Sequence, residues 1–279
     1  MSIKSNSRYG VRTNTIGSSI KKDVDGKIEG KARPRSGVMI PFKNQQQLTP
    51  YAPSWDFNIA EKYLTTEEID CSKLAEFLLT KESEVLAIND YEVNDCGTKV
   101  GKDSTTARYL YYNVLEWENE EISKLKKEIA DFHAQYFMKT MNSETYPSVN
   151  CRCWMNILRK GQRIHKHLHG VGPQAYLSGH FTVACDETKT IYVNPYEGAS
   201  DEDLLRRVQN GEQFDMSNAL YPADNVVGKM TLFPNFVPHL TTEHTSDEPR
   251  ITLAFEITPF ESLPGQKRPG ETDLVRLYS

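Results

Sequence analysis

The chain has 279 residues, of which 38% are hydrophobic and 25% charged, as in a soluble globular protein with a sizeable core. No apolar run approaches the roughly 20 residues that span a bilayer, and the start MSIKSNSRYG lacks the apolar stretch of a secretory signal. The five cysteines form no small-scaffold disulfide pattern, so we expect a cytoplasmic protein with reduced thiols and no membrane partner.

The net charge of −5 conceals two regions of opposite sign. Residues 1–45 hold ten Lys or Arg and three Asp or Glu, whereas the remainder holds 23 basic and 35 acidic residues. We therefore expect residues 1–50, which are poor in apolar side chains, to form a basic flexible tail on an acidic body. Attachment of this tail to nucleic acid or to an acidic partner is the alternative, but the acidic body argues against a nucleic-acid partner.

Residues 51–148 are expected to form a support region of extended segments and helices. The run APSWDFNIAEKYL (52–64) is predicted to be extended. A helix follows over 70–82, because its apolar residues recur at helical spacing. Asp70 or Ser72 is its expected N-terminal cap.

The second half of this support region contains the longest predicted helix. Residues 92–106 are polar and hold two glycines, which predicts a loop, and the aromatic run ARYLYYNV (107–114) predicts a strand. A helix is predicted over 119–142, where apolar residues recur at steps of three and four. His133 lies beside this apolar stripe and is expected to be a packed or surface histidine rather than a metal ligand.

Residues 149–260 change to short strand-like runs separated by Gly, Pro, Asn or Asp. Such a pattern predicts an all-β sandwich or barrel. Residues 201–225 form an acidic insertion that is expected to be partly helical, and residues 261–279 are expected to form a C-terminal tail. The predicted strands are 151–160, 163–169, 175–185, 190–195, 228–234, 236–242 and 250–258.

The run GQRIHKHLHG (161–170) carries three of the seven histidines. If it is a strand, His165, His167 and His169 share one face, with alternate residues about 6.6 Å apart. Two rings can then share one metal ion, either 165 with 167 or 167 with 169, and His167 belongs to both pairs. The alternative is a polar strand face that meets solvent. The CRC run at 151–153 is a second candidate half-site, but without another Cys pair buried thiols are favoured.

A third metal ligand has to come from a distant segment, because catalytic metal sites usually take three protein ligands. His239 is the candidate, since it follows an apolar strand and a Pro-bounded turn, whereas His244 is expected on a loop surface. Arg250 opens an otherwise apolar strand. If that strand alternates, Arg250 and Thr252 face one way, where a guanidinium would need a planar anionic partner such as a ligand carboxylate.

Together these segments resemble the Fe(II)/2-oxoglutarate-dependent oxygenases. The resemblance is closest to the phage and bacterial group whose pattern runs W-x-N, a Gly followed six residues later by HxH, LSG, LFPxxxPH and R-I-x-x-x-F. The chain has WMNILRKG at 154–161, LSG at 177–179, LFPNFVPH at 232–239 and RITLAF at 250–255. The resemblance covers about residues 95–258. It implies a mainly β fold with packing helices (α+β), built on a double-stranded β-helix (jelly roll) closed by N-terminal helices.

The resemblance also implies the site residues and the cofactors. His167 and His239 would bind Fe(II), and Arg250 would bind the distal carboxylate of 2-oxoglutarate. His169 stands where the superfamily usually has a carboxylate ligand. Either three histidines bind the metal, or a water takes the position of the carboxylate and His169 does not bind the metal directly. Because the HxH of the family begins six residues after the Gly, here Gly161, the resemblance implies His167 and His169 as the pair and leaves His165 at the pocket rim. Two further residues are candidates for co-substrate binding beside Thr252, each with a structural alternative: His180 and Asn156.

The implied function is a dioxygenase that uses 2-oxoglutarate and O2 to hydroxylate a C–H of an unidentified substrate, a peptidyl side chain or a small molecule. The loop at 94–106 and the insertion at 201–225 would select the substrate. One alternative is a non-catalytic metal-binding β-barrel tethered by its basic tail. The other is a three-His cupin-type dioxygenase that needs no 2-oxoglutarate. An Arg250 that faces the cavity favours the first function over both alternatives.

Overall fold

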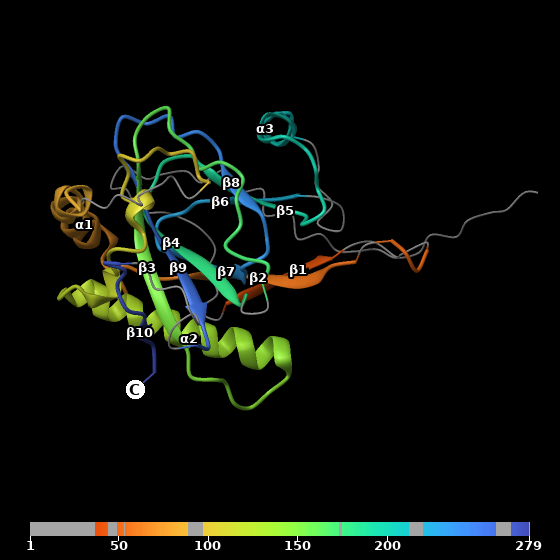
Figure 1. Ribbon diagram of the computed structural model, residues 1–279, viewed down its shortest axis with the longest axis horizontal. Coiled ribbons are helices and arrows are strands. Elements are labelled where there is room, and N and C mark those ends of the chain that lie inside the picture. Colours follow the sequence, from red (N-terminus) through yellow and green to blue (C-terminus); the bar gives the residue numbers. More distant parts are fainter. Residues whose placement is uncertain are drawn as a thin grey trace, which may run out of the picture. The chain divides into compact units, whose positions relative to one another are not determined.

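The computed structural model describes residues 37–43, 49–52, 54–88, 97–172, 175–211, 220–260 and 269–278 (Figure 1). The chain divides into two units, Met1–Arg33 and Pro34–Ser279, and every described residue belongs to the second. Among the described residues, no helix has the length and apolar character needed to cross a membrane.

Two antiparallel sheets form the framework of the described residues. The larger sheet has the strand order β1-β2-β7-β4-β9-β3-β10, and the smaller has the order β6-β5-β8. The larger sheet consists of β1 (Val38–Lys43), β2 (Asp56–Tyr63), β3 (Asn150–Leu158), β4 (Leu177–Ala184), β7 (Lys229–Pro234), β9 (Arg250–Thr258) and β10 (Val275–Arg276). The smaller consists of β5 (Lys189–Val193), β6 (Leu220–Asp224) and β8 (His239–Thr241).

The chain passes back and forth between the two sheets as it forms the core strands. β3 and β4 belong to the larger sheet, β5 and β6 to the smaller, β7 to the larger, β8 to the smaller and β9 to the larger. This is the topology of a double-stranded β-helix, or jelly roll. It confirms the expected fold class, a mainly β protein with packing helices. The expected closure into a barrel is wrong, because the strands pair as two separate sheets among the described residues.

Two helices pack against the larger sheet. α1 (Cys71–Leu86) begins at Asp70, whose side chain accepts hydrogen bonds from the backbone N–H groups of Ser72 and Lys73, as expected for an N-cap. α2 (Glu120–Met141) is the longest described helix. The apolar faces of both helices join one hydrophobic core with β3, β4, β7 and β9. The predicted helices and the Asp70 cap are therefore confirmed.

The predicted strand at 107–114 is wrong. The segment contains two short 3-10 helices, η1 (Thr106–Arg108) and η2 (Val114–Glu116). Polar side chains of this segment, not its backbone, accept hydrogen bonds from the backbone N–H groups of β3, so the segment does not pair with β3 as a strand. Met155 N donates to the Tyr112 hydroxyl, and Cys153 N donates to Asn113 Oδ1.

The predicted strand at 163–169 is also wrong. It makes one isolated antiparallel bridge, between His167 and His239. Its other backbone bonds go to different segments: Ile164 O accepts from Thr241 N on β8, whereas His165 N donates to Thr98 O and His169 N donates to Asn235 O in two loops. The segment therefore crosses the mouth of the jelly roll as an irregular strap beside β8.

Both expected tails contain residues that belong to the sheet. Within 1–50, β1 pairs with β2, and Phe42 is fully buried against Phe57. Within 261–279, β10 pairs with β3. The flexible-tail boundaries are corrected accordingly, while residues 1–36 and 261–268 lie outside the described residues.

The acidic insertion at 201–225 is partly helical, as expected. α3 (Asp201–Gln209) begins at Ser200, whose hydroxyl accepts from Asp203 N. The insertion also supplies β6, a strand of the smaller sheet that was not expected. The segment therefore combines a surface helix with a structural strand.

Candidate active site

A pocket lies between the two sheets. Arg250, Thr252, Ala254 and Glu256, which alternate along β9, line it from the larger sheet, and His239 lines it from the smaller. The intervening residues of β9 face the other way and are buried in the core shared with the helices. The expected alternation of the strand at 250–258 is therefore confirmed.

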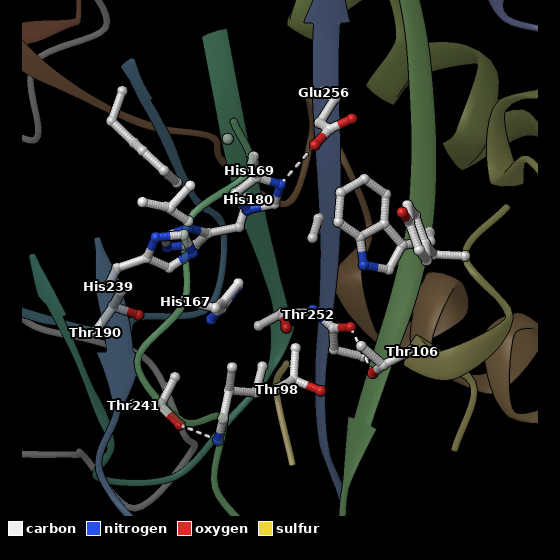
Figure 2. Close-up of a pocket in the computed structure, with 18 of the residues that line it drawn as sticks. Thr98, Thr106, His167, His169, His180, Thr190, His239, Thr241, Thr252 and Glu256 are labelled. Carbon is white, nitrogen blue, oxygen red and sulfur yellow. Dashed lines mark hydrogen bonds and ion pairs between the residues drawn. The ribbon is translucent and has the colours of Figure 1, made fainter. Parts of the chain in front are cut away.

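Three histidines converge in this pocket: His167, His169 and His239 (Figure 2). One ring nitrogen of each lies within 4.8 Å of the other two. The rings of His169 and His239 are stacked, with centroids 5.2 Å apart and planes 3° from parallel. The centroids of His167 and His239 are 4.3 Å apart. The cluster holds the 167/169 pair and His239, and not the 165/167 pair.

The outer nitrogen of each ring has an oxygen partner. His167 Nδ1 lies 2.8 Å from His165 O, and His239 Nδ1 lies 3.1 Å from Val237 O. His169 Nδ1 lies 2.8 Å from Glu256 Oε1. Carbonyl and carboxylate oxygens only accept, so each Nδ1 carries a proton. Such bonds to the second nitrogen are typical of metal-binding histidines.

Burial keeps two members of the cluster, His167 and His239, neutral. It lowers the pKa of His167 to about 4, with a smaller contribution from His169. It also lowers the pKa of His239 well below the ordinary value, and both neighbouring histidines add to the effect. Neutral imidazoles are the form that binds a metal ion, since the Nε2 lone pair must be unprotonated.

Arg250 is 2% exposed and lines the same pocket. Its Nε and Nη1 atoms have no hydrogen-bond partner among the described residues. Burial lowers the pKa of Arg250 to about 10, so the guanidinium is still charged at neutral pH. A buried cation without a partner is costly, and a bound carboxylate would complete its hydrogen bonding.

Three other expected residues also line the pocket: Thr252, Asn156 and His180. Thr252 and Asn156 are directly paired across β9 and β3, and Asn156 Oδ1 accepts from the Thr106 hydroxyl. His180 pairs with Ala254 across β4 and β9. Burial lowers the pKa of His180 to about 3, so its ring is neutral and could act only through hydrogen bonds.

Three of the four histidines outside the cluster do not line the pocket. His165 Nδ1 lies 2.9 Å from an oxygen of Asp201 on α3, next to the pocket but not lining it. His133 is fully buried, and its two ring nitrogens bond the hydroxyls of Tyr278 and Tyr176, as expected for a packed histidine. His244 was expected on a surface, but it is 1% exposed with Nε2 bonded to Glu248 O, so that prediction is wrong.

The cysteines of the CRC run are fully buried in the helix-facing core. Burial raises the pKa of both thiols, Cys151 and Cys153, so neither is poised as a thiolate ligand. The buried-thiol interpretation is therefore the one that fits, and the half-site is not formed.

Glu256 is the site residue that sequence reasoning missed. The alternation of β9 could have identified it, because Glu256 lies an even number of residues from Arg250 and Thr252 and therefore on the same face of the strand. A carboxylate at an inward position of a strand that is otherwise apolar needs a partner. That partner is His169, as the dashed line in Figure 2 marks.

Residues 152–256 match the family model described as "Putative 2OG-Fe(II) oxygenase". The match confirms the expected resemblance to the Fe(II)/2-oxoglutarate-dependent oxygenases, a family that uses Fe(II) and 2-oxoglutarate. No curated protein matches the chain.

The chain is also similar to solved structures, at low identity. Against a prolyl-4-hydroxylase from Pseudomonas putida the identity is 11% and the TM-score 0.43, with 72% of this chain and 91% of that chain covered. Against AviO1 from Streptomyces viridochromogenes Tue57 the identity is 12% and the TM-score 0.46, with 75% of this chain and 92% of that chain covered. Against HygX from Streptomyces hygroscopicus, solved with nickel and 2-oxoglutarate bound, the identity is 13% and the TM-score 0.44, with 79% of this chain and 93% of that chain covered.

Proposed function

We propose, from the premise that residues 152–256 form a 2OG-Fe(II) oxygenase domain, that this protein is a dioxygenase that hydroxylates an unactivated C–H bond. The substrate would be a peptidyl side chain or a small molecule, and 2-oxoglutarate would leave as succinate and CO2. The single observation that supports this most is Arg250, a buried cation whose Nε and Nη1 have no hydrogen-bond partner among the described residues. It lies in the pocket that also holds the three converging histidines.

The described residues fit both cofactors. Three imidazoles whose ring nitrogens lie close together form a donor set that suits iron and other first-row metals, so His167, His169 and His239 would hold Fe(II). Among the described residues, Nε and Nη1 of Arg250 have no hydrogen-bond partner, so their N–H groups are available to a bound carboxylate. Bound together, Fe(II) and 2-oxoglutarate supply the O2-dependent oxidation, which no side chain can supply by itself.

The side chains of the pocket position the co-substrate. Arg250 would bind its distal carboxylate, and the Thr252 hydroxyl would add a hydrogen bond from the next inward position of β9. His180 and Asn156 are candidates for its other polar atoms. Ala254 separates Trp154 from His180 across the sheet and leaves space between them, because its side chain is a single methyl group.

Two segments are proposed to select the substrate. Thr98, in the loop that precedes η1, and Thr106, the first residue of η1, line the pocket. Asp201 at the start of α3 bonds both Arg163 and His165, which ties the insertion to the strap that carries the metal-binding histidines. Loops on a rigid scaffold commonly carry specificity, so changes in these segments should alter the Km for substrate more than the affinity for Fe(II).

Arg250 also separates the proposed function from its alternatives. A non-catalytic metal-binding barrel or a three-His cupin-type dioxygenase would need the histidines but no buried cation beside them. An unpaired guanidinium destabilises a protein that has no anion to bind, and this one is retained within the pocket. The cost is understandable if an acid such as 2-oxoglutarate is the partner.

The test is an anaerobic titration with Fe(II) and 2-oxoglutarate, followed by the metal-to-ligand charge-transfer absorption. The wild type should develop the band, and His167→Ala should not. His165→Ala is the matched control, since His165 lies on the same strap but bonds Asp201 instead of joining the cluster. A wild type without the band, or a band that persists in His167→Ala, would refute the proposed function.

A further inference from the structure

The proposed metal site contains no carboxylate ligand at the position where the two-His-one-carboxylate triad has one. His169 stands there instead, two residues after His167. Among the described residues that line the pocket, Glu256 is the only acidic one. Its carboxylate does not belong to the cluster of mutually close donor atoms, but it contacts the third histidine directly.

The ring of His169 contacts four other rings: Trp154, His167, Phe233 and His239. His239 stacks on it at 5.2 Å, and the Trp154 ring lies 5.7 Å away at a tilt of 42°. The backbone N–H of His169 donates to Asn235 O, which fixes the strap locally. These contacts fix the plane of the ring but not which edge faces the metal. That choice depends on the 2.8 Å bond from Nδ1 to Glu256 Oε1.

The other two histidines do not need such a distant partner. His167 and His239 each bond the carbonyl two residues earlier in their own segment. His169 alone among the three bonds a side chain, from a residue 87 positions away on β9. The carboxylate also carries charge, which a carbonyl does not, and a hydrogen-bonded carboxylate makes an imidazole a more basic ligand.

We propose that Glu256 is a positioning residue that acts through His169, so that the His169–Glu256 pair supplies the orientation and the negative charge of the missing carboxylate ligand. The inference rests on the proposed function, because it assumes that the three-histidine cluster binds a metal. Charge balance supports it. A divalent ion and the Arg250 guanidinium together exceed a 2-oxoglutarate dianion by one positive charge, and Glu256 restores neutrality.

A double-mutant cycle on metal affinity tests the pair, with Co(II) as the probe and its visible absorption as the readout. The four proteins are the wild type, Glu256→Gln, His169→Asp and the double variant. In the wild-type background Glu256→Gln keeps an acceptor oxygen but loses the charge, and we expect Co(II) affinity to fall by about 10-fold or more, within the range typical of outer-shell partners. Glu256→Ala removes both and should cost more.

The loss of Co(II) affinity caused by Glu256→Gln should disappear or reverse in the His169→Asp background. The introduced aspartate would supply the carboxylate directly and would face Glu256 as a like charge. Glu256→Gln should therefore leave Co(II) affinity unchanged or improve it there, and the two substitutions should be strongly coupled. Equal losses in both backgrounds would mean that Glu256 acts only through general stability, and the inference would be wrong.

Two controls separate this outcome from other failures. Glu128→Gln removes a carboxylate that pairs with Lys62 outside the pocket, and Co(II) affinity should not change. Urea unfolding of each apo protein reports whether a variant is folded before metal is added. If the wild type binds no Co(II), the proposed metal site itself fails, and that result is distinct from binding without coupling.

Discussion

The two faces of β9 differ in how completely their side chains are satisfied. On the outer face, Ile251, Leu253, Phe255 and Ile257 are at most 1% exposed and pack in the core that the helices share. On the inner face, Arg250 is as deeply buried but lacks partners for two of its nitrogens. Equal burial therefore has opposite consequences, because apolar atoms need only contact whereas a charged group needs a partner.

Within this one strand, the outer face contributes to stability and the inner face provides groups for ligand binding. The outer face contributes hydrophobic and dispersion energy that is complete in the free protein. The inner face keeps groups whose best partners are not part of the chain. Retaining such groups lowers stability, and it is a common feature of ligand sites. Substitutions on the two faces should therefore change stability in opposite directions.

The largest effect on stability should come from Leu253→Ala on the outer face. Leu253 is fully buried between β3 and β4, and truncation leaves a cavity. We expect the free energy of unfolding to fall by about 2–5 kcal/mol. Urea denaturation measures this, and Co(II) affinity of the folded variant should stay the same. An equal loss of Co(II) affinity would show that the two faces are not independent.

The inner face should behave in the opposite way. Arg250→Met replaces an unpartnered buried cation with an apolar chain of similar length, so the apo protein should become more stable by about 1–3 kcal/mol. The same change should weaken 2-oxoglutarate binding by about 2–5 kcal/mol, the usual loss when a charged partner is removed. Thermal melts with and without 2-oxoglutarate measure both, and an apo protein that becomes less stable would contradict the comparison.

The helix layer behind the outer face should make stability depend on pH through His133. Burial lowers the pKa of His133 to about 4, whereas the unfolded chain has the ordinary value of about 6.5. The unfolded state then binds more protons between these values, so stability falls as pH drops below about 6.5. From pH 7 to pH 5 this group should account for about 2 kcal/mol.

His133→Gln isolates this contribution from those of His167, His180 and His239, whose lowered pKa values act in the same direction. The variant should lose less stability between pH 7 and pH 5 than the wild type, by that same amount. Urea denaturation at both pH values gives the difference. If the wild type and the variant lose equal stability, the tyrosine-bonded His133 does not stay neutral on folding.

Sequence reasoning identified the convergent residues but not the local backbone that brings them together. His167, His239 and Arg250 were marked by motif spacing, and the alternation of the last long strand placed Arg250 and Thr252 on one face. The strand predicted for 163–169 failed because periodicity cannot reveal where backbone groups bond. His165 N and His169 N bond residues from two different loops, Thr98 and Asn235.

Two other misses have the same origin in long-range contacts. His244 lies in a polar sequence that predicts exposure, yet its ring is buried and bonds Glu248 O four residues later. Glu256 follows an apolar run whose outward residues dominate the pattern, and its partner lies 87 residues away. Residues whose role depends on a distant partner are the ones that a local pattern does not identify.

The different anchors of the three histidines have a consequence for folding. His167 and His239 are oriented by carbonyls within their own segments, which can form as soon as those segments are in place. His169 is oriented by Glu256, near the end of the last long strand of the larger sheet. The three-histidine site is complete only when β9 has docked, so tight metal binding reports that the jelly roll has finished assembling.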